Sequence, residues 1–152
     1  MNREILFRGK RLDNGEWVTG RLITDDRDGK EFIVSSIGYH WEEDNGSTNR
    51  CMECFGFEVD PKTVGQYTGL TIKGEKLFEH DHVRFREAEI DDWEYGTVVW
   101  CGESDYPAFD VEPWIDCDCN GLSYIVAECE AEIIGNKWDD GDLLSGGDTH
   151  DW

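Results

Sequence analysis

The chain has 152 residues, with 35 acidic and 14 basic side chains, a net charge of −21 and 38% hydrophobic residues. Such a charge repels nucleic acid and anionic lipid, which argues against direct binding to either and favours basic proteins or cations as partners. No run approaches the ~18 apolar residues of a membrane span, and the N-terminus lacks the apolar segment of a signal peptide. We therefore expect a cytoplasmic protein whose six cysteines are reduced.

The first sixty residues are predicted to be strands joined by turns. Strand-type runs occupy residues 4–11, 16–23, 32–37 and 51–59. Asp13-Asn14-Gly15 lies between the first two runs, and Asn-Gly in that position is a strong hairpin signal because both residues tolerate positive φ. A second turn cluster covers residues 24–29. We expect residues 38–50 to be a polar, mobile loop.

The second part of the chain is predicted to consist of shorter strands around an acidic insertion. Its strand-type runs are residues 66–70, 76–78, 82–86, 95–100, 122–127 and 132–138. A polar turn at Lys73-Gly74 separates the first two runs. Residues 87–94 form an insertion with five carboxylates, and residues 101–121 read as a long irregular connection.

These features together predict the fold class. Many short strands, with turn signals every ~8–12 residues and no sustained 3.6-residue period, indicate an all-β fold, a small barrel or sandwich with long irregular loops and little helix. We expect a single domain over residues 1–152. Its parts would be N-terminal strands and a loop (1–60), a barrel core with the acidic insertion (63–144) and a frayed tail (145–152).

Several segments carry a family resemblance. The matching pieces are residues 5–18, 59–70, 74–79, 96–100, 132–136 and 142–144, together with Asp81 and Val83. With the distinctive block Val64-Gly-Gln-Tyr-Thr-Gly-Leu70 among them, the chain resembles the YopX-like family of phage and prophage proteins. The resemblance implies an all-β fold with an SH3-like barrel element, a phage origin and the cytoplasm of a bacterial host, but no established activity. The chain departs from the family at Glu79-His-Asp-His-Val83, where Glu-Gly-Asp-Ile-Val is usual, and in its acidic loop and cysteine pairs.

Two cysteine pairs form a candidate structural zinc site. Cys51, Cys54, Cys117 and Cys119 could supply four thiolates at ~2.3 Å from one tetrahedral ion. A regular strand turns residues 51 and 54 to opposite faces, so this site requires a turn at Met52-Glu53. The alternative is a set of reduced, partly buried cysteines with no metal and no other cofactor.

Other catalytic signals are sparse. On a strand, His80 and His82 would share one face and could bind a transition metal or exchange protons; the alternative is two solvated histidines. There is no Gly-x-Gly-x-x-Gly after a strand, no phosphate loop, no serine nucleophile elbow and no His-Glu-x-x-His. We therefore expect a protein that is not an enzyme.

The acidic half is the strongest functional signal. Residues 87–136 contain 14 Asp or Glu and no Lys or Arg, although like charges on neighbouring strands destabilise each other. Carboxylates at alternate strand positions lie roughly 6–7 Å apart, which approaches the spacing of phosphates along a nucleic-acid strand. A solvated face that only confers solubility is the alternative. The predicted partner-contacting residues are Glu87, Glu89, Asp91, Asp92, Trp93, Glu94, Glu103, Asp105, Asp110, Glu112, Asp116 and Asp118.

These observations lead to one functional hypothesis and two alternatives. The hypothesis is a non-enzymatic phage protein that inhibits a basic, nucleic-acid-binding host protein by nucleic-acid mimicry. Its target class would be a defence nuclease, such as a CRISPR effector or restriction enzyme, or a replication or transcription factor. The alternatives are a β-barrel that sequesters a nucleotide-like signal and a structural or oligomeric phage accessory protein.

Overall fold

The computed structural model describes residues 4–102, 107–117 and 120–140, which fall into two compact units divided between Gln66 and Tyr67. Of the described residues, 58% lie in strands and 8% in helices, which confirms the prediction of an all-β fold. The described strands form two antiparallel sheets and no closed barrel, so the barrel itself is not formed by this part of the chain. The predicted tail at 145–152 lies outside the described residues.

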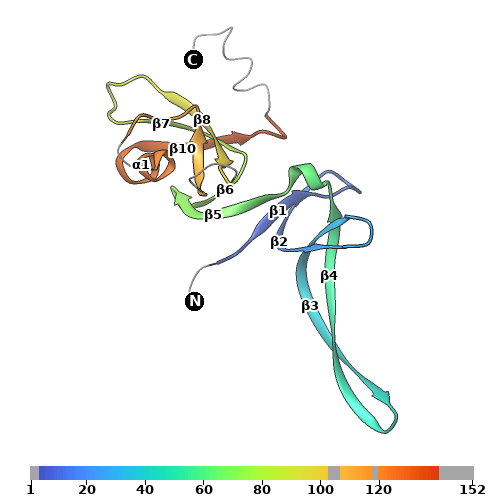
Figure 1. Cartoon of the computed structure of the whole chain (residues 1–152). Helices are drawn as coiled ribbons and strands as arrows, with labels where there is room; N and C mark the ends of the chain where they lie inside the picture. The colour runs from blue at the N-terminus through green and yellow to red at the C-terminus, as the bar shows by residue number, and fades with distance from the viewer. Residues whose placement is uncertain (1–3, 103–106, 118–119, 141–152) are drawn as a thin grey trace. The chain divides into compact units, whose positions relative to one another are not determined.

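The N-terminal unit is an antiparallel sheet with the strand order β4-β3-β2-β1 (Figure 1). Its strands are β1 (Phe7–Lys10), β2 (Trp17–Thr24), β3 (Glu31–Asp44) and β4 (Ser47–Val59); a 3-10 turn, η1 (Pro61–Thr63), follows, and β1 also pairs with the first residues of β5 (Gly65–Ile72). The predicted hairpin between β1 and β2 is confirmed. Gly15 there has a φ of 72°, and the Arg11 amide donates to the Glu16 carbonyl over 2.9 Å.

The expected loop at residues 38–50 is wrong, because β3 and β4 continue through it as a long two-stranded ribbon (Figure 1). Pairing extends to Asp44 opposite Ser47, and the turn is Asn45-Gly46 with φ values of 49° and 82°. Two consecutive positive φ values are what a tight hairpin turn requires, and Asn-Gly provides them at low cost.

The base of the ribbon is its packed part. β2 pairs with β3 only up to Arg21 opposite Val34, and a register shift follows between Val34 and Ser36. Ile33 at this level is fully buried. A Cβ on Gly20 would lie 2.1 Å from the Val34 carbonyl oxygen, so glycine is needed where the backbones approach.

The outer ribbon has two different faces, because side chains alternate along each strand. One face carries large apolar side chains that are about half exposed or more: Ile37, Tyr39, Trp41 and Met52. The opposite face carries His40, Glu42, Cys51 and Glu53.

The C-terminal unit contains a β-hairpin, a four-stranded antiparallel sheet of order β10-β7-β8-β9 and one helix. The elements are the remainder of β5, β6 (Glu75–Phe78), β7 (Asp81–Arg86), β8 (Glu94–Trp100), β9 (Phe109–Glu112), α1 (Gly121–Glu128) and β10 (Glu130–Asn136). The predicted turn at Lys73-Gly74 is confirmed, with φ values of 51° and 82°. The core of this unit consists of Ile72, Leu77, Val83, Phe85, Val98, Val111, Leu122, Ile125 and Ala131.

The strand expected at residues 122–127 is instead the helix α1. Asn120 caps it: its side-chain oxygen accepts the Ser123 amide over 2.9 Å, which satisfies one of the free N–H groups of the first turn. Leu122 and Ile125 are spaced by three residues and both are buried in the core. Within the described residues, no helix is long and apolar enough to cross a membrane.

Candidate functional site

The acidic insertion is a short ordered loop between β7 and β8. The Asp91 amide donates to the Ala88 carbonyl over 2.9 Å, and the Ala88 amide donates to an Asp91 carboxylate oxygen over 3.0 Å. Arg86 at the end of β7 donates to the Glu89 carbonyl over 3.2 Å. The five carboxylates that the loop presents are all exposed: Glu87, Glu89, Asp91, Asp92 and Glu94. These backbone and side-chain hydrogen bonds thus hold the loop in shape while its five acidic residues stay exposed.

Tyr124 on α1 anchors the start of this loop. Its hydroxyl donates to the Glu87 carboxylate, and this hydrogen bond raises the pKa of Tyr124 well above its ordinary value. A residue 37 positions further along the chain therefore fixes where the loop leaves β7. This contact could not be predicted from the sequence, because Tyr124 lies in a segment whose pattern predicts a strand and not a helix.

Two acidic residues of β10 pair with basic side chains from earlier in the chain. Arg86 Nε lies 3.1 Å from Glu130, while Arg84 and Lys73 both pair with Glu132. Partial burial opposes ionisation of Glu132, and the hydrogen bonds from Lys73 and Arg84 outweigh it, so the pKa of Glu132 is lowered. Glu130 and Glu132 on β10 are therefore compensated, contrary to the expectation of an acidic stretch without counter-charges.

Trp93, near the end of the loop, packs against Arg84 and Arg86. The guanidinium carbons of Arg84 and Arg86 each lie 4.1 Å from the centre of its ring, in cation–π geometry. Trp93 is half-buried. Since both arginines face Trp93 and β10, the five loop carboxylates make no ion pair among the described residues.

The other predicted contact residues fall into three groups. Asp110 is buried, with 1% of its surface exposed, and its Oδ1 accepts the Val111 amide over 2.8 Å and the Leu122 amide over 3.2 Å. Its assignment to a partner-binding surface is wrong, because these contacts join β9 to the first turn of α1. Glu112 and Asp116 are exposed, as a surface role requires. Three residues lie outside the described residues: Glu103, Asp105 and Asp118.

The two histidines do not form a pair on one strand face. His80 lies in the turn before β7 with a φ of 78°, and its ring meets Trp138 edge-on with centres 5.4 Å apart. His82 is on β7, is only 3% exposed, and its Nδ1 lies 2.8 Å from the Thr97 hydroxyl. Burial lowers the pKa of His82, although Asp140 opposes this. The expected pair of solvated histidines is wrong, and so is the shared strand face.

The four-cysteine zinc site lacks the turn that it requires. β4 is continuous through Met52 and Glu53, so Cys51 and Cys54 point to opposite faces of the strand. Cys117 is half-buried in the other unit, and Cys119 lies outside the described residues.

A different set of donors meets on the ribbon. One ligand atom from each of His40, Glu42 and Cys51 lies within 4.8 Å of the others. His40 Nε2 is 2.8 Å from Glu42 Oε1 and its Nδ1 is 3.0 Å from Glu53 Oε1. The hydrogen bond that His40 donates to the Glu42 carboxylate raises the pKa of His40, while desolvation and the charge of Glu42 raise the pKa of Cys51. The missed signal was Asn45-Gly46, since a turn there places residues 40 and 51 opposite each other.

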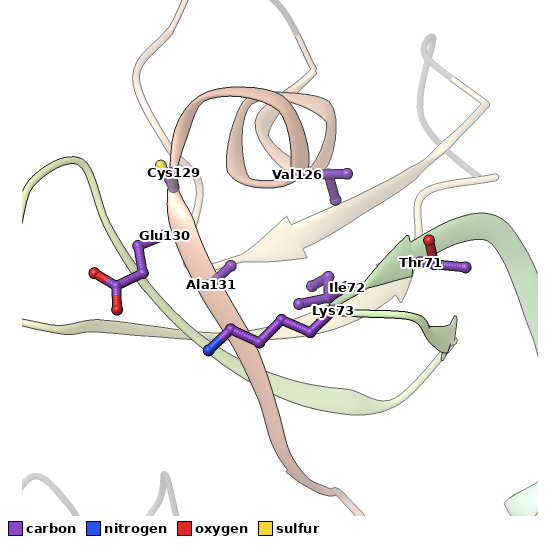
Figure 2. Close-up of a pocket in the computed structure, with 7 residues that line it drawn as sticks. All are labelled: Thr71, Ile72, Lys73, Val126, Cys129, Glu130 and Ala131. Atoms are coloured by element: carbon purple, nitrogen blue, oxygen red, sulfur yellow. The ribbon is translucent and has the colours of Figure 1, made fainter.

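The C-terminal unit also has a small hollow between the β5–β6 turn and β10 (Figure 2). In Figure 2, Cys129 and Val126 lie at the top of the hollow, Lys73 lies at the bottom, and Ile72 and Ala131 lie between them. Its volume is about 210 Å³, whereas ligand sites usually measure roughly 300–1,000 Å³. A second hollow, beside Phe109 and Leu122, is about 360 Å³. The first is too small for a nucleotide-like ligand, and the second is at the lower end of that range.

Comparison with known proteins adds a fold but no activity. No protein-family model and no curated protein matches the chain. The chain is similar in structure to protein EF1440 from Enterococcus faecalis, with a TM-score of 0.54, 16% sequence identity, and coverage of 94% of this chain and 99% of that one. At this identity the likeness shows the mostly β fold alone. The resemblance to the YopX-like family stays a prediction.

Proposed function

We propose that this chain is a non-enzymatic accessory protein of a phage or prophage that binds a basic, nucleic-acid-binding protein in the cytoplasm of its bacterial host. The observation that carries the proposal is the loop at residues 87–94, where five exposed carboxylates are held on an ordered backbone. The nearby Arg84 and Arg86 are turned to Trp93 and β10. The loop charges are therefore available to a cationic partner.

Electrostatics favour a partner whose own site is built for phosphates. A groove that binds nucleic acid concentrates Lys and Arg, and a preformed anionic loop competes for the same charges. Because exposed charges are screened within about 10 Å at ~0.1 M salt, such binding is strong at low salt and weakens as salt rises. Inhibition then follows from occupying the groove, with no covalent chemistry at the loop.

The test uses proteins that a host lysate retains on duplex DNA at about 50 mM salt, where phosphate contacts are strong. Added full-length protein is expected to elute a subset of them at this low salt. A loop-neutralised variant, with Gln or Asn at the five carboxylates, is expected to elute none. Asn at Asp91 keeps the oxygen that accepts the Ala88 amide, so the loop shape is retained.

The matched control has the same change in charge on the other unit. It replaces five exposed carboxylates of the N-terminal unit by their amides: Glu16, Asp26, Asp28, Glu43 and Asp44. This control is expected to elute the same proteins as the unaltered chain. Equal elution by the loop-neutralised variant would remove the loop from the function, and failure of all forms would refute the proposal.

One observation favours a second candidate, a self-associating accessory protein. Tyr39 and Trp41 on the apolar face of the ribbon are 53% and 68% exposed. Aromatic residues such as these are enriched in the cores of protein–protein interfaces. Sedimentation velocity of the intact chain and of Trp41→Ser would then show a concentration-dependent dimer that the substitution abolishes. Ile90→Ser, at a 91% exposed position on the acidic loop, is the control that should leave the dimer intact.

A further inference from the structure

We propose that the polar face of the β3–β4 ribbon is a zinc-binding site, with His40, Glu42 and Cys51 as ligands and Glu53 as the residue that orients the imidazole. This inference is independent of the acidic loop, which belongs to the other unit. It also differs from the four-cysteine arrangement, since only one of those cysteines takes part.

The register of the ribbon brings the donors together. His40 lies directly opposite Cys51 in the antiparallel pair, and directly opposed side chains have Cβ atoms about 4.5–5.5 Å apart. Glu42 is two residues from His40 on β3, and Glu53 is two residues from Cys51 on β4. A period of two puts all four side chains on the same face.

The geometry needs only small side-chain movements to hold an ion. Zinc binds sulfur at ~2.3 Å and nitrogen or oxygen at ~2.0–2.2 Å, so its ligand atoms sit roughly 3.3–3.8 Å apart. The three donor atoms already lie within 4.8 Å of one another. Contraction by about 1 Å is within the reach of rotations of Glu42 and Cys51, both on extended strands whose backbones stay in place.

The donor types select the metal. Thiolate and imidazole favour zinc over calcium or magnesium, which take oxygen ligands. A thiolate and a carboxylate together also balance the two charges of the ion. Three protein ligands leave the fourth tetrahedral position for water or for a donor from a partner.

Glu53 lies beside the imidazole nitrogen of His40 that would not bind the metal. His40 Nδ1 is a buried atom 3.0 Å from Glu53 Oε1 and has no hydrogen bond of regular geometry. When Nε2 binds a metal the ring proton is on Nδ1, and a small rotation of the Glu53 side chain would align its carboxylate to accept that proton. Histidines that bind metals usually have such a partner, and its loss typically lowers affinity about 10–100-fold.

Cobalt(II) reports this site directly, because a bound thiolate gives a charge-transfer band and tetrahedral coordination gives intense visible bands. Titration of the reduced full-length chain is expected to reach one Co²⁺ per chain, and Zn²⁺ should abolish the bands by displacement. Cys51→Ser should lose the charge-transfer band, and His40→Gln should weaken binding at least about tenfold. Glu53→Gln should weaken it about 10–100-fold with the bands unchanged in shape.

Cys54→Ser is the matched control, since Cys54 lies on the same strand but on the opposite face. It should bind Co²⁺ as the unaltered chain does; loss of binding here would instead support the four-cysteine arrangement and overturn this proposal. The absence of any band at stoichiometric Co²⁺, or a band that persists in Cys51→Ser, would also overturn it. A measurement on the unaltered chain guards against misfolded variants: in NMR spectra, Zn²⁺ should shift the ring signals of His40 and leave those of His80 and His82 in place.

Discussion

Replacement of Asp110 tests whether a buried carboxyl group, rather than a surface charge, is what the β9–α1 region needs. Its Oδ1 accepts the buried amides of Val111 and Leu122. Asp110→Ala removes this acceptor and leaves two buried N–H groups without a partner, and each unmet buried donor costs about 1–3 kcal/mol. We expect the free energy of unfolding of the C-terminal unit to fall by about 2–4 kcal/mol. Asp110→Asn keeps Oδ1 and should lose less.

The assay is urea unfolding followed by tryptophan fluorescence, with thermal unfolding as a second measure. For a unit of this size, each kcal/mol moves the melting temperature by about 4–8 °C, so the expected 2–4 kcal/mol corresponds to a loss of roughly 8–32 °C. Glu112→Ala is the control, because it removes an exposed carboxylate two residues away and should change stability by no more than about 0.5 kcal/mol. If Asp110→Ala and Glu112→Ala unfold at the same urea concentration, the structural role assigned to Asp110 is refuted.

Two further predictions concern backbone approach and pH. Gly56→Ala should destabilise the N-terminal unit by about 1–3 kcal/mol, because the new Cβ would lie 2.3 Å from the Ile33 carbonyl oxygen; Gly38→Ala meets only an aromatic side chain and should cost less in the same urea assay. Burial lowers the pKa of His82 against the opposing effect of Asp140, so below pH ~6.5 the unfolded chain takes up a proton that the folded chain resists. Stability should therefore fall as pH drops from about 7 towards 5, and a plot for His82→Gln that is parallel to that of the unaltered chain would contradict this.

The sequence predicts β structure and most turns because these depend on neighbouring residues. Asn14-Gly15 predicts a hairpin because strand-type runs flank it on both sides. Asn45-Gly46 has the same chemistry, but the polar residues around it suggested a loop, and only pairing across the whole ribbon makes strands of them. The local pattern of polar residues predicts a loop there, whereas the pairing of β3 with β4 makes these residues part of two strands.

The candidate site was less predictable for a related reason. Exposure of the acidic loop follows from its composition, whereas the burial of Asp110 depends on an amide 12 residues away. The helix α1 has only eight residues, too few for its period to stand out among β-type side chains. The donor set around His40 needed the register of the ribbon before its members could be seen as neighbours.

Beyond residues 36 and 55, the two strands of the described β3–β4 ribbon pair with each other and with no third strand. A two-stranded hairpin is marginally stable by itself, so amide hydrogen exchange should be slow beside buried Ile33 and progressively faster towards Asn45-Gly46. Opening therefore starts at the tip and leaves the sheet at the base intact. A ligand on either face can slow exchange along the ribbon without stabilising the rest of the chain, which makes the ribbon a local sensor of binding.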